Sequence, residues 1–173
     1  MVILSALKSR WTIVGFQPNK DKLIFLGDII DRGEDNLAVL VLLRDLDALV
    51  VLGNHEHLMI ESIMARDEGA KGLWNKNSGQ WHKLISEELL IAHCQWLIKQ
   101  SLSLVVDYQG HRIGLSHTRP PVWDWENPPS NKSKVVAALL SDRELYNKGS
   151  ILKNDGVWIF QFMDTIQLNF PFG

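Results

Sequence analysis

The chain has 173 residues, of which 46% are hydrophobic and 22% charged, and its formal net charge is −2 at pH 7. These values are typical of one globular domain over residues 1–173, and they give no electrostatic reason to expect nucleic acid or anionic lipid as a partner. The single cysteine, Cys94, cannot form an internal disulfide, and no stretch approaches the roughly 20 apolar residues that a membrane helix needs. The first residues also lack the basic and apolar regions of a signal peptide. We therefore expect a cytoplasmic protein that binds neither membranes nor nucleic acid.

In chain order, the first predicted element is an amphipathic helix over residues 1–10, followed by irregular chain over 9–14. The apolar run at 23–26 predicts a buried strand, a helix follows over about 37–45, and a second apolar strand covers 49–52. Strand, helix and strand together predict a βαβ unit with parallel strands.

The rest of the chain predicts more helix and then a hairpin. Residues 55–66 and most of 70–100 have helical patterns, and Trp74, Trp81 and Trp96 are interpreted there as packing residues. The remaining expected elements are a hairpin of 102–108 with 111–116, a helix over 134–146 and a strand over 156–162. The predicted fold class is therefore α/β.

Polar residues stand immediately after, or one residue beyond, the ends of three of these strands. Asp28 lies in Gly27-Asp28-Ile29-Ile30-Asp31-Arg32-Gly33, Asn54 in Gly53-Asn54-His55-Glu56, and His117 follows the hairpin. Open α/β sheets bind ligands at the carboxyl ends of their strands. A carboxylate, an amide oxygen and an imidazole form a mixed donor set that suits Mn²⁺, Fe²⁺ or Zn²⁺ better than calcium.

The same two segments also contain residues suited to phosphoryl chemistry. Asp31 and His55 would form a dyad in which the carboxylate orients the imidazole and raises its pKa, so that His55 acts as a general acid. Arg32 could hold phosphate oxygens bidentately. Glu56 is interpreted as an acidic residue in the first turn of a helix. A single histidine at a strand end is more often structural, so the prediction depends on the two segments together.

GDIIDRG, GNHE and Ser116-His117 resemble the motifs of the calcineurin-like metallophosphoesterases, above all the bacterial and phage serine/threonine protein phosphatases. The resemblance implies a β-sandwich flanked by helices and two metal ions bridged by an aspartate and a hydroxide that attacks phosphorus in line. By position, Asp28 resembles the bridging ligand, Asn54 and His117 resemble ligands of the second metal, and Arg32 and Arg143 resemble the phosphate-binding arginines. His55 and Asp31 resemble the acid dyad.

Two departures from the family pattern predict a domain truncated at both ends. The family begins with a strand that ends in Asp-x-His-Gly, whereas this chain starts at what resembles the following helix. The family also has a late Gly-His-Thr motif, and here Asp164 stands in the place of its histidine, where it would act as a metal ligand through oxygen.

The resemblance implies a manganese-dependent phosphoesterase that hydrolyses phosphoserine or phosphothreonine in proteins, so a phosphoprotein or phosphopeptide is the expected partner. One alternative is a bis(nucleoside) tetraphosphate hydrolase. Another is a catalytically inactive relative, a binding module or truncated gene product that keeps the phosphate-binding residues.

Overall fold

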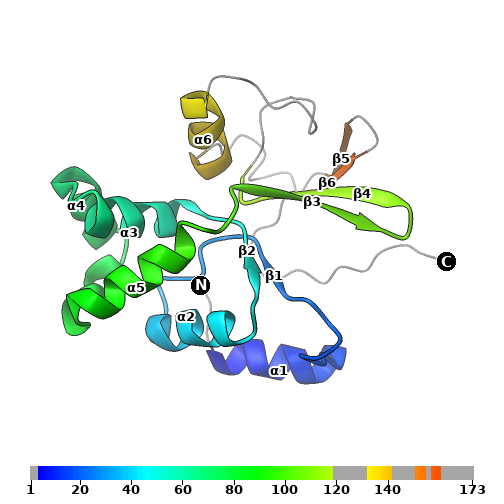
Figure 1. Ribbon diagram of the computed structural model, residues 1–173, viewed down its shortest axis with the longest axis horizontal. Helices are drawn as coiled ribbons and strands as arrows, with labels where there is room; N and C mark the ends of the chain where they lie inside the picture. The colour runs from blue at the N-terminus through cyan, green and yellow to red at the C-terminus, as the bar shows by residue number, and fades with distance from the viewer. Residues whose placement is uncertain (1–3, 119–131, 142–150, 155–156, 161–173) are drawn as a thin grey trace.

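The computed structural model describes residues 4–118, 132–141, 151–154 and 157–160 (Figure 1). Within them the structure combines the helices α1 to α6 and the 3₁₀ helix η1 with six strands, as the α/β prediction expected. Their bounds are α1 Leu4–Val14, β1 Ile24–Phe25, α2 Asn36–Asp45, β2 Leu49–Val50, α3 Asn54–Met64, α4 Glu68–Lys76, η1 Gly79–Leu84, α5 Glu87–Leu97, β3 Ser103–Tyr108, β4 His111–Ser116, α6 Lys132–Ser141, β5 Ile151–Asn154 and β6 Val157–Phe160.

The βαβ unit predicted around the first acidic segment is present. Strands β1 and β2 pair in parallel, with Ile24 opposite Leu49 and Phe25 opposite Val50, and α2 forms the crossover between them. A further parallel bridge joins Val51 to Ser101, so the chain beyond β2 is tied to the segment that leads into β3. This pairing holds the carboxyl ends of β1 and β2 side by side, at the points where the loops with Asp28 and Asn54 begin.

The second sheet has four described strands in the order β3-β4-β6-β5. Strands β3 and β4 form the predicted antiparallel hairpin, and their turn has positive φ at Gln109 (49°) and Gly110 (78°), as favoured two-residue hairpin turns require. Strand β6 lies parallel beside β4 and accounts for most of the predicted strand over 156–162, whereas β5 was not predicted. The hairpin brings the residues that follow β4 next to β1.

One helix prediction is wrong, and another is tested only in part. The chain over 9–14 is not irregular, since α1 continues to Val14 and the Thr12 hydroxyl donates to the Lys8 carbonyl at 3.2 Å. The predicted 134–146 helix is described only to Ser141, and the remainder lies outside the described residues. In the helical middle, Ser86 caps α5 by accepting the Leu89 N–H, and Glu87 and Glu88 follow it in the first turn of that helix.

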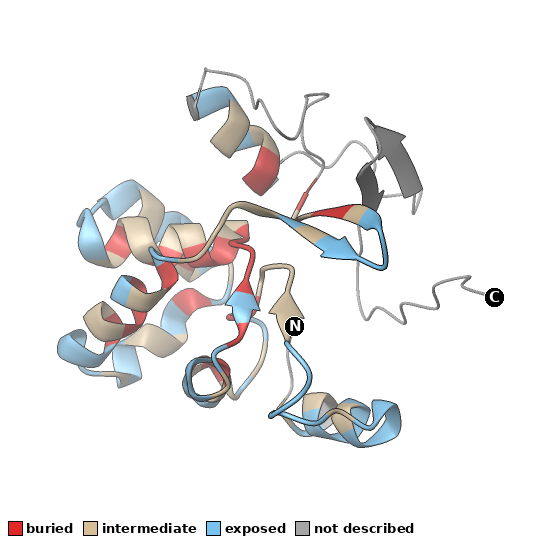
Figure 2. Ribbon diagram, turned by 45° about the vertical axis from the view of Figure 1, so that its right-hand side comes forward, coloured by how far each residue is buried: buried red, intermediate tan, exposed pale blue. Residues whose placement is uncertain are grey.

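The hydrophobic core lies where α2, α3, α4 and α5 meet β2. Its buried side chains include Val39, Leu40, Leu43, Val50, Met59, Trp74, Leu90 and Leu97. Figure 2 shows the buried residues concentrated among these elements, while the outer sides of the helices are exposed. The polar loop after β2 therefore starts directly at this core, and Phe25 of β1 packs against the same core.

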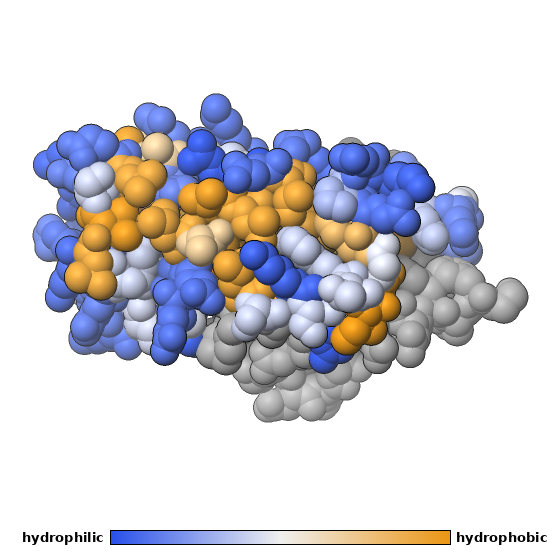
Figure 3. All heavy atoms as spheres, turned by 90° about the horizontal axis from the view of Figure 1, so that it is seen from below, coloured by the Kyte–Doolittle hydropathy of each residue, from blue (hydrophilic) through white to orange (hydrophobic). Residues whose placement is uncertain are grey.

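Apolar side chains also remain on the outer surface. Figure 3 views the molecule from below and shows them gathered in a band on that face. A groove of about 580 Å³ lies between α1 and α2, lined by Leu4, Leu37, Ala38, Val41 and Leu42 with polar residues at its rim. None of the helices in the described part of the chain is both long and apolar enough to cross a bilayer.

Candidate active site

The loop after β1 has an unusual backbone. Gly27 has φ 86°, and three residues with side chains, Asp28 (51°), Asp31 (69°) and Arg32 (56°), also have positive φ. A left-handed conformation costs roughly 1–2 kcal/mol for an L-residue with a side chain. Strain of this size persists only where surrounding contacts hold the backbone, and it is common at functional sites.

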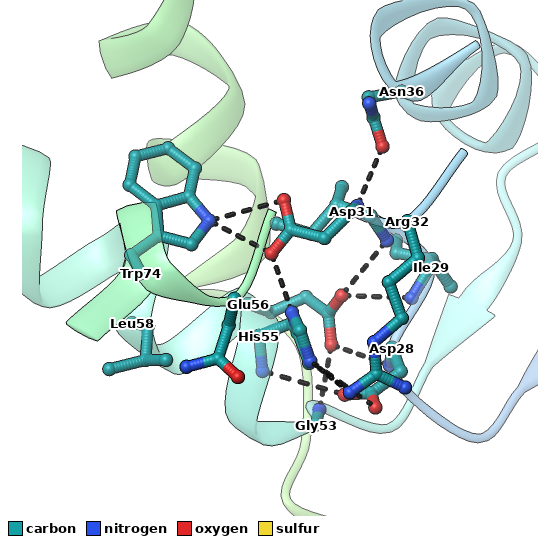
Figure 4. Close-up of polar contacts among 12 residues, drawn as sticks. Asp28, Ile29, Asp31, Arg32, Asn36, Gly53, His55, Glu56, Leu58 and Trp74 are labelled. Atoms are coloured by element: carbon teal, nitrogen blue, oxygen red, sulfur yellow. Dashed lines mark hydrogen bonds and ion pairs between the residues drawn. The ribbon is translucent and has the colours of Figure 1, made fainter. Parts of the chain in front are cut away.

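The side chain of Glu56 supplies those contacts. Its carboxylate is buried and accepts four backbone N–H groups: Oε2 from Asp28 (2.8 Å) and Gly53 (2.9 Å), and Oε1 from Ile29 (2.9 Å) and Ile30 (3.3 Å) (Figure 4). Burial, and after it the charge of Asp28, raises the pKa of Glu56, while the hydrogen bonds from the backbone act in the opposite direction. Glu56 thus joins the two polar loops.

Two glycines let these loops approach each other. A Cβ at Gly27 would lie 2.6 Å from His117 Nδ1 and 2.7 Å from the Gly53 nitrogen. A Cβ at Gly53 would lie 2.5 Å from Asp28 Oδ1. Because real Cβ atoms do not make such contacts, only glycine fits at both positions.

Asp28, His117 and Asn54 are brought together at this junction. His117 Nδ1 donates to the Leu26 carbonyl at 2.7 Å, and its other ring nitrogen, Nε2, lies 3.3 Å from Asp28 Oδ1. Asn54 Oδ1 is buried, and among the described residues it has no hydrogen-bond partner. A cation would satisfy this orphaned oxygen, and the donor set fits Mn²⁺, Fe²⁺ or Zn²⁺. No group of three His, Cys, Asp or Glu side chains forms a metal site within the described part of the chain, so the fit depends on the amide.

Asp31 and His55 are in direct contact. His55 Nδ1 lies 2.5 Å from Asp31 Oδ2, and both side chains are about 1% exposed. Asp31 also accepts indole N–H groups from Trp74 and Trp81, and its backbone N–H donates to Asn36 Oδ1 at 2.6 Å (Figure 4). The carboxylate is therefore surrounded by donors, which permits its burial.

The other ring nitrogen of His55 faces the candidate metal site and Arg32. Arg32 Nη2 donates to Nε2 at 3.1 Å, and Asp28 Oδ2 lies 3.9 Å from the same nitrogen. Burial lowers the pKa of His55, but the hydrogen bond to Asp31 and the charges of Asp28 and Asp31 outweigh it, and the pKa is raised above 6.5. Arg32 acts against this increase.

Six of the eight residues predicted from the sequence are therefore placed at one junction: Asp28, Asp31, Arg32, Asn54, His55 and His117. Arg143 and Asp164, predicted as a phosphate-binding residue and as a metal ligand, lie outside the described residues.

For three residues of the site, the structure shows contacts that the sequence analysis did not predict. Glu56 was expected to act only on its own helix, although its bond to the Gly53 N–H does match that expectation. Trp74 and Trp81 were assigned to packing, yet both indoles bond Asp31. The one available signal was burial, because a buried indole N–H needs an acceptor.

Comparison with known proteins gives one family match. The sequence model described as calcineurin-like phosphoesterase matches residues 3–160. Serine/threonine-protein phosphatase 1 of Salmonella typhimurium is 31% identical over 160 residues, which cover 89% of this chain and 71% of that protein.

Other similar proteins have a different substrate in their names. The symmetrical bis(5′-nucleosyl)-tetraphosphatase of Shewanella baltica strain OS223 is 32% identical over 134 residues, and the match covers 75% of this chain and 45% of that protein. A solved structure described as a candidate diadenosine tetraphosphatase has a TM-score of 0.53 at 18% identity, covering 83% of this chain and 61% of that one. At that identity the structural likeness concerns the fold alone.

Proposed function

Since the chain belongs to the calcineurin-like phosphoesterase family, whose members are hydrolytic and use divalent metals, we propose that it hydrolyses phosphate monoesters of serine and threonine in proteins. The observation that supports this proposal best is the orientation of His55. Its Nδ1 is held by Asp31 at 2.5 Å, while Nε2 points toward Arg32 and Asp28, where a phosphoryl group would bind.

The proposed reaction assigns a separate role to each group. Water supplies the oxygen that forms a new bond to phosphorus and gives up a proton to solvent, while the bond from phosphorus to the ester oxygen breaks. The leaving alkoxide takes a proton from His55 Nε2, and His55 regains a proton from solvent. Arg32 must leave Nε2 before that nitrogen can carry a proton, and phosphoryl oxygens offer its guanidinium a bidentate partner. Binding of the phosphoryl group would therefore draw Arg32 away from His55 Nε2 and allow that nitrogen to take up the proton that it later donates.

Asp28, Asn54 and His117 would hold the metal, for which we propose Mn²⁺. A bound divalent cation neutralises phosphoryl charge and lowers the pKa of water. The chain's own contribution is to orient the ligands. Leu26 fixes the tautomer of His117, and Gly53 lets the backbone come close to Asp28.

Calorimetry with MnCl₂ alone tests the metal site without needing turnover. Asp28→Asn keeps the shape of the side chain but removes the charge, so Mn²⁺ binding should weaken strongly. Asp107→Asn, on the exposed side of β3, should leave it unchanged. Equal Mn²⁺ affinity in all three proteins would remove Asp28 from the proposed site.

Hydrolysis of a phosphoserine peptide with Mn²⁺ tests the reaction. His55→Gln should lower kcat about 10²-fold or more, as loss of a general acid does. His57→Gln, two residues further on the same helix and partly exposed, is the matched control and should retain full activity.

The names of the tetraphosphatase relatives suggest one competing substrate, a bis(5′-nucleosyl) tetraphosphate. Faster cleavage of that compound than of the phosphopeptide would assign the chain to the second activity. Mn²⁺ and phosphate binding without turnover of either compound would indicate a binding module instead.

A further inference from the structure

We propose that Trp74 and Trp81 are positioning residues of the acid dyad, whose indole N–H groups fix the Asp31 carboxylate so that it in turn orients His55. This inference rests on the function proposed above for His55. It assigns to the two tryptophans a role that their pattern in the sequence did not indicate.

The contacts divide the Asp31 carboxylate between three donors. Oδ1 accepts Trp81 Nε1–H at 2.6 Å and, more weakly, Trp74 Nε1–H at 3.2 Å. Oδ2 accepts Trp74 Nε1–H at 3.0 Å and the His55 ring at 2.5 Å. A carboxylate offers about four lone-pair sites, and these four contacts occupy them. Rotation of the Asp31 carboxylate about χ2 would therefore break at least one of the four contacts. The orientation of His55 is therefore set by the two indoles as well as by Asp31.

Three separate elements bring these donors to one carboxylate. His55 comes from α3, Trp74 from α4 and Trp81 from η1, and the two indoles pack edge to face with centroids 5.8 Å apart. Figure 4 shows Trp74 on the side of Asp31 opposite Arg32. Trp74 thus contacts the dyad on the side away from Arg32 and His55 Nε2, where the substrate would bind in place of Arg32.

The local backbone is built to place Trp81. Ser78 has φ 75°, and the chain then passes so close to the Trp74 ring that a Cβ on Gly79 would lie 2.4 Å from its Cδ1. The opposite side of Trp74 is not left free, because His82 stacks on it with ring centroids 4.8 Å apart. Packing alone does not explain this geometry for Trp81, whose half-buried indole could donate to water instead of to a buried carboxylate.

The contacts themselves can be tested without any activity. In ¹H–¹⁵N spectra of the whole chain, Asp31→Asn should shift the indole N–H resonances of Trp74 and Trp81, because an amide is a weaker acceptor than a carboxylate. The indole resonance of Trp11, on α1, should stay in place. Unmoved resonances of Trp74 and Trp81 would overturn the proposal whether or not the protein is a phosphatase.

The positioning role is tested with Trp81→Phe and Trp74→Phe, which keep an aromatic ring but remove the donor. Trp96→Phe on α5 is the matched control. We expect both variants to change the Nδ1–H resonance of His55, and the control to leave it alone. In the two tryptophan variants, kcat on phenyl phosphate should fall roughly tenfold more than kcat on 4-nitrophenyl phosphate. Phenolate is a poor leaving group that needs a proton from His55, whereas 4-nitrophenolate leaves without one.

Each outcome decides the proposal. Equal losses on the two aryl phosphates, or an unchanged His55 resonance in a folded Trp81→Phe protein, would reduce the tryptophans to packing residues. If the wild-type protein hydrolyses neither the phosphoserine peptide nor the aryl phosphates, the proposed function fails, and the His55 and indole resonances still decide whether the tryptophans orient the dyad. If Trp81→Phe does not fold, the Asp31→Asn spectra and Trp74→Phe decide.

Discussion

Replacing Glu56 with alanine should destabilise the protein more than almost any other single substitution in the described chain. The change removes the acceptor of four buried backbone N–H groups, three of them at 2.8–2.9 Å. A buried donor left without a partner costs about 1–3 kcal/mol. Water entering the vacated space and relief of the repulsion from Asp28 offset part of this loss.

We therefore expect Glu56→Ala to lower the free energy of unfolding by about 3–5 kcal/mol, a large share of the roughly 5–15 kcal/mol that small domains have. Glu56→Gln should cost less, because one oxygen still accepts two N–H groups, although its NH₂ then faces two other donors. Glu61→Ala, on the same helix with an exposed side chain, is the matched control and should change stability by less than about 0.5 kcal/mol.

Urea unfolding followed by circular dichroism measures these differences, and hydrogen exchange locates them. In wild type the amides of Asp28 and Ile29 should exchange slowly, and in Glu56→Ala they should exchange quickly even where the protein is folded. A cost below about 1 kcal/mol, together with protected amides at these two positions, would refute the role of Glu56 in holding the loop.

Two further substitutions test other parts of the structure. Gly27→Ala combines a positive φ with a Cβ 2.6 Å from His117 Nδ1 and should cost about 3 kcal/mol or more in urea unfolding, whereas Gly110→Ala, with φ 78° in open space, should cost only about 1–2 kcal/mol. Equal costs would show that crowding at Gly27 is unimportant. His93→Leu should stabilise the chain by about 1–2 kcal/mol, because both ring nitrogens of His93 are buried without a partner in the described structure. Burial, and after it the charge of Arg44, lowers the pKa of His93 in the folded chain. As the pH falls below about 6.5, this histidine is therefore protonated in the unfolded chain before it is protonated in the folded chain, and the free energy of unfolding decreases. Thermal melts from pH 7.5 to 5 should show a smaller loss in His93→Leu than in wild type, and identical pH dependence in the two proteins would contradict this linkage.

The sequence was informative wherever local patterns determine structure. Apolar runs ending in Gly-Asp and Gly-Asn predicted β1, β2 and the parallel unit, which the structure confirms, and the Gln109-Gly110 turn predicted the hairpin. The metallophosphoesterase-type fold, predicted from the motifs, is confirmed by the family match and by the structural neighbour. The roles assigned to the site residues stay predictions, although six of the residues meet.

Contacts between distant parts of the chain were the ones that the sequence did not reveal. Glu56 bonds residues 26–28 positions away, and Trp81 bonds Asp31 across 50 positions, so neither partner could be found from spacing along one element. The helix continuing through 9–14 was missed because its residues, Thr12 and Ile13 among them, have modest intrinsic helix propensity.

The left-handed loop after β1 has a consequence for how the protein can be studied. Because Asp28, Asp31 and Arg32 hold unfavourable backbone angles through bonds to residues from α2, α3, α4 and η1, the loop has no stability of its own and exists only in the fully assembled domain. Any ion or anion that binds there recognises the native state alone and must raise the melting temperature by mass action. A thermal-shift screen of divalent cations and phosphate compounds therefore reads out the occupant of this loop directly, even for a chain that turns over no substrate.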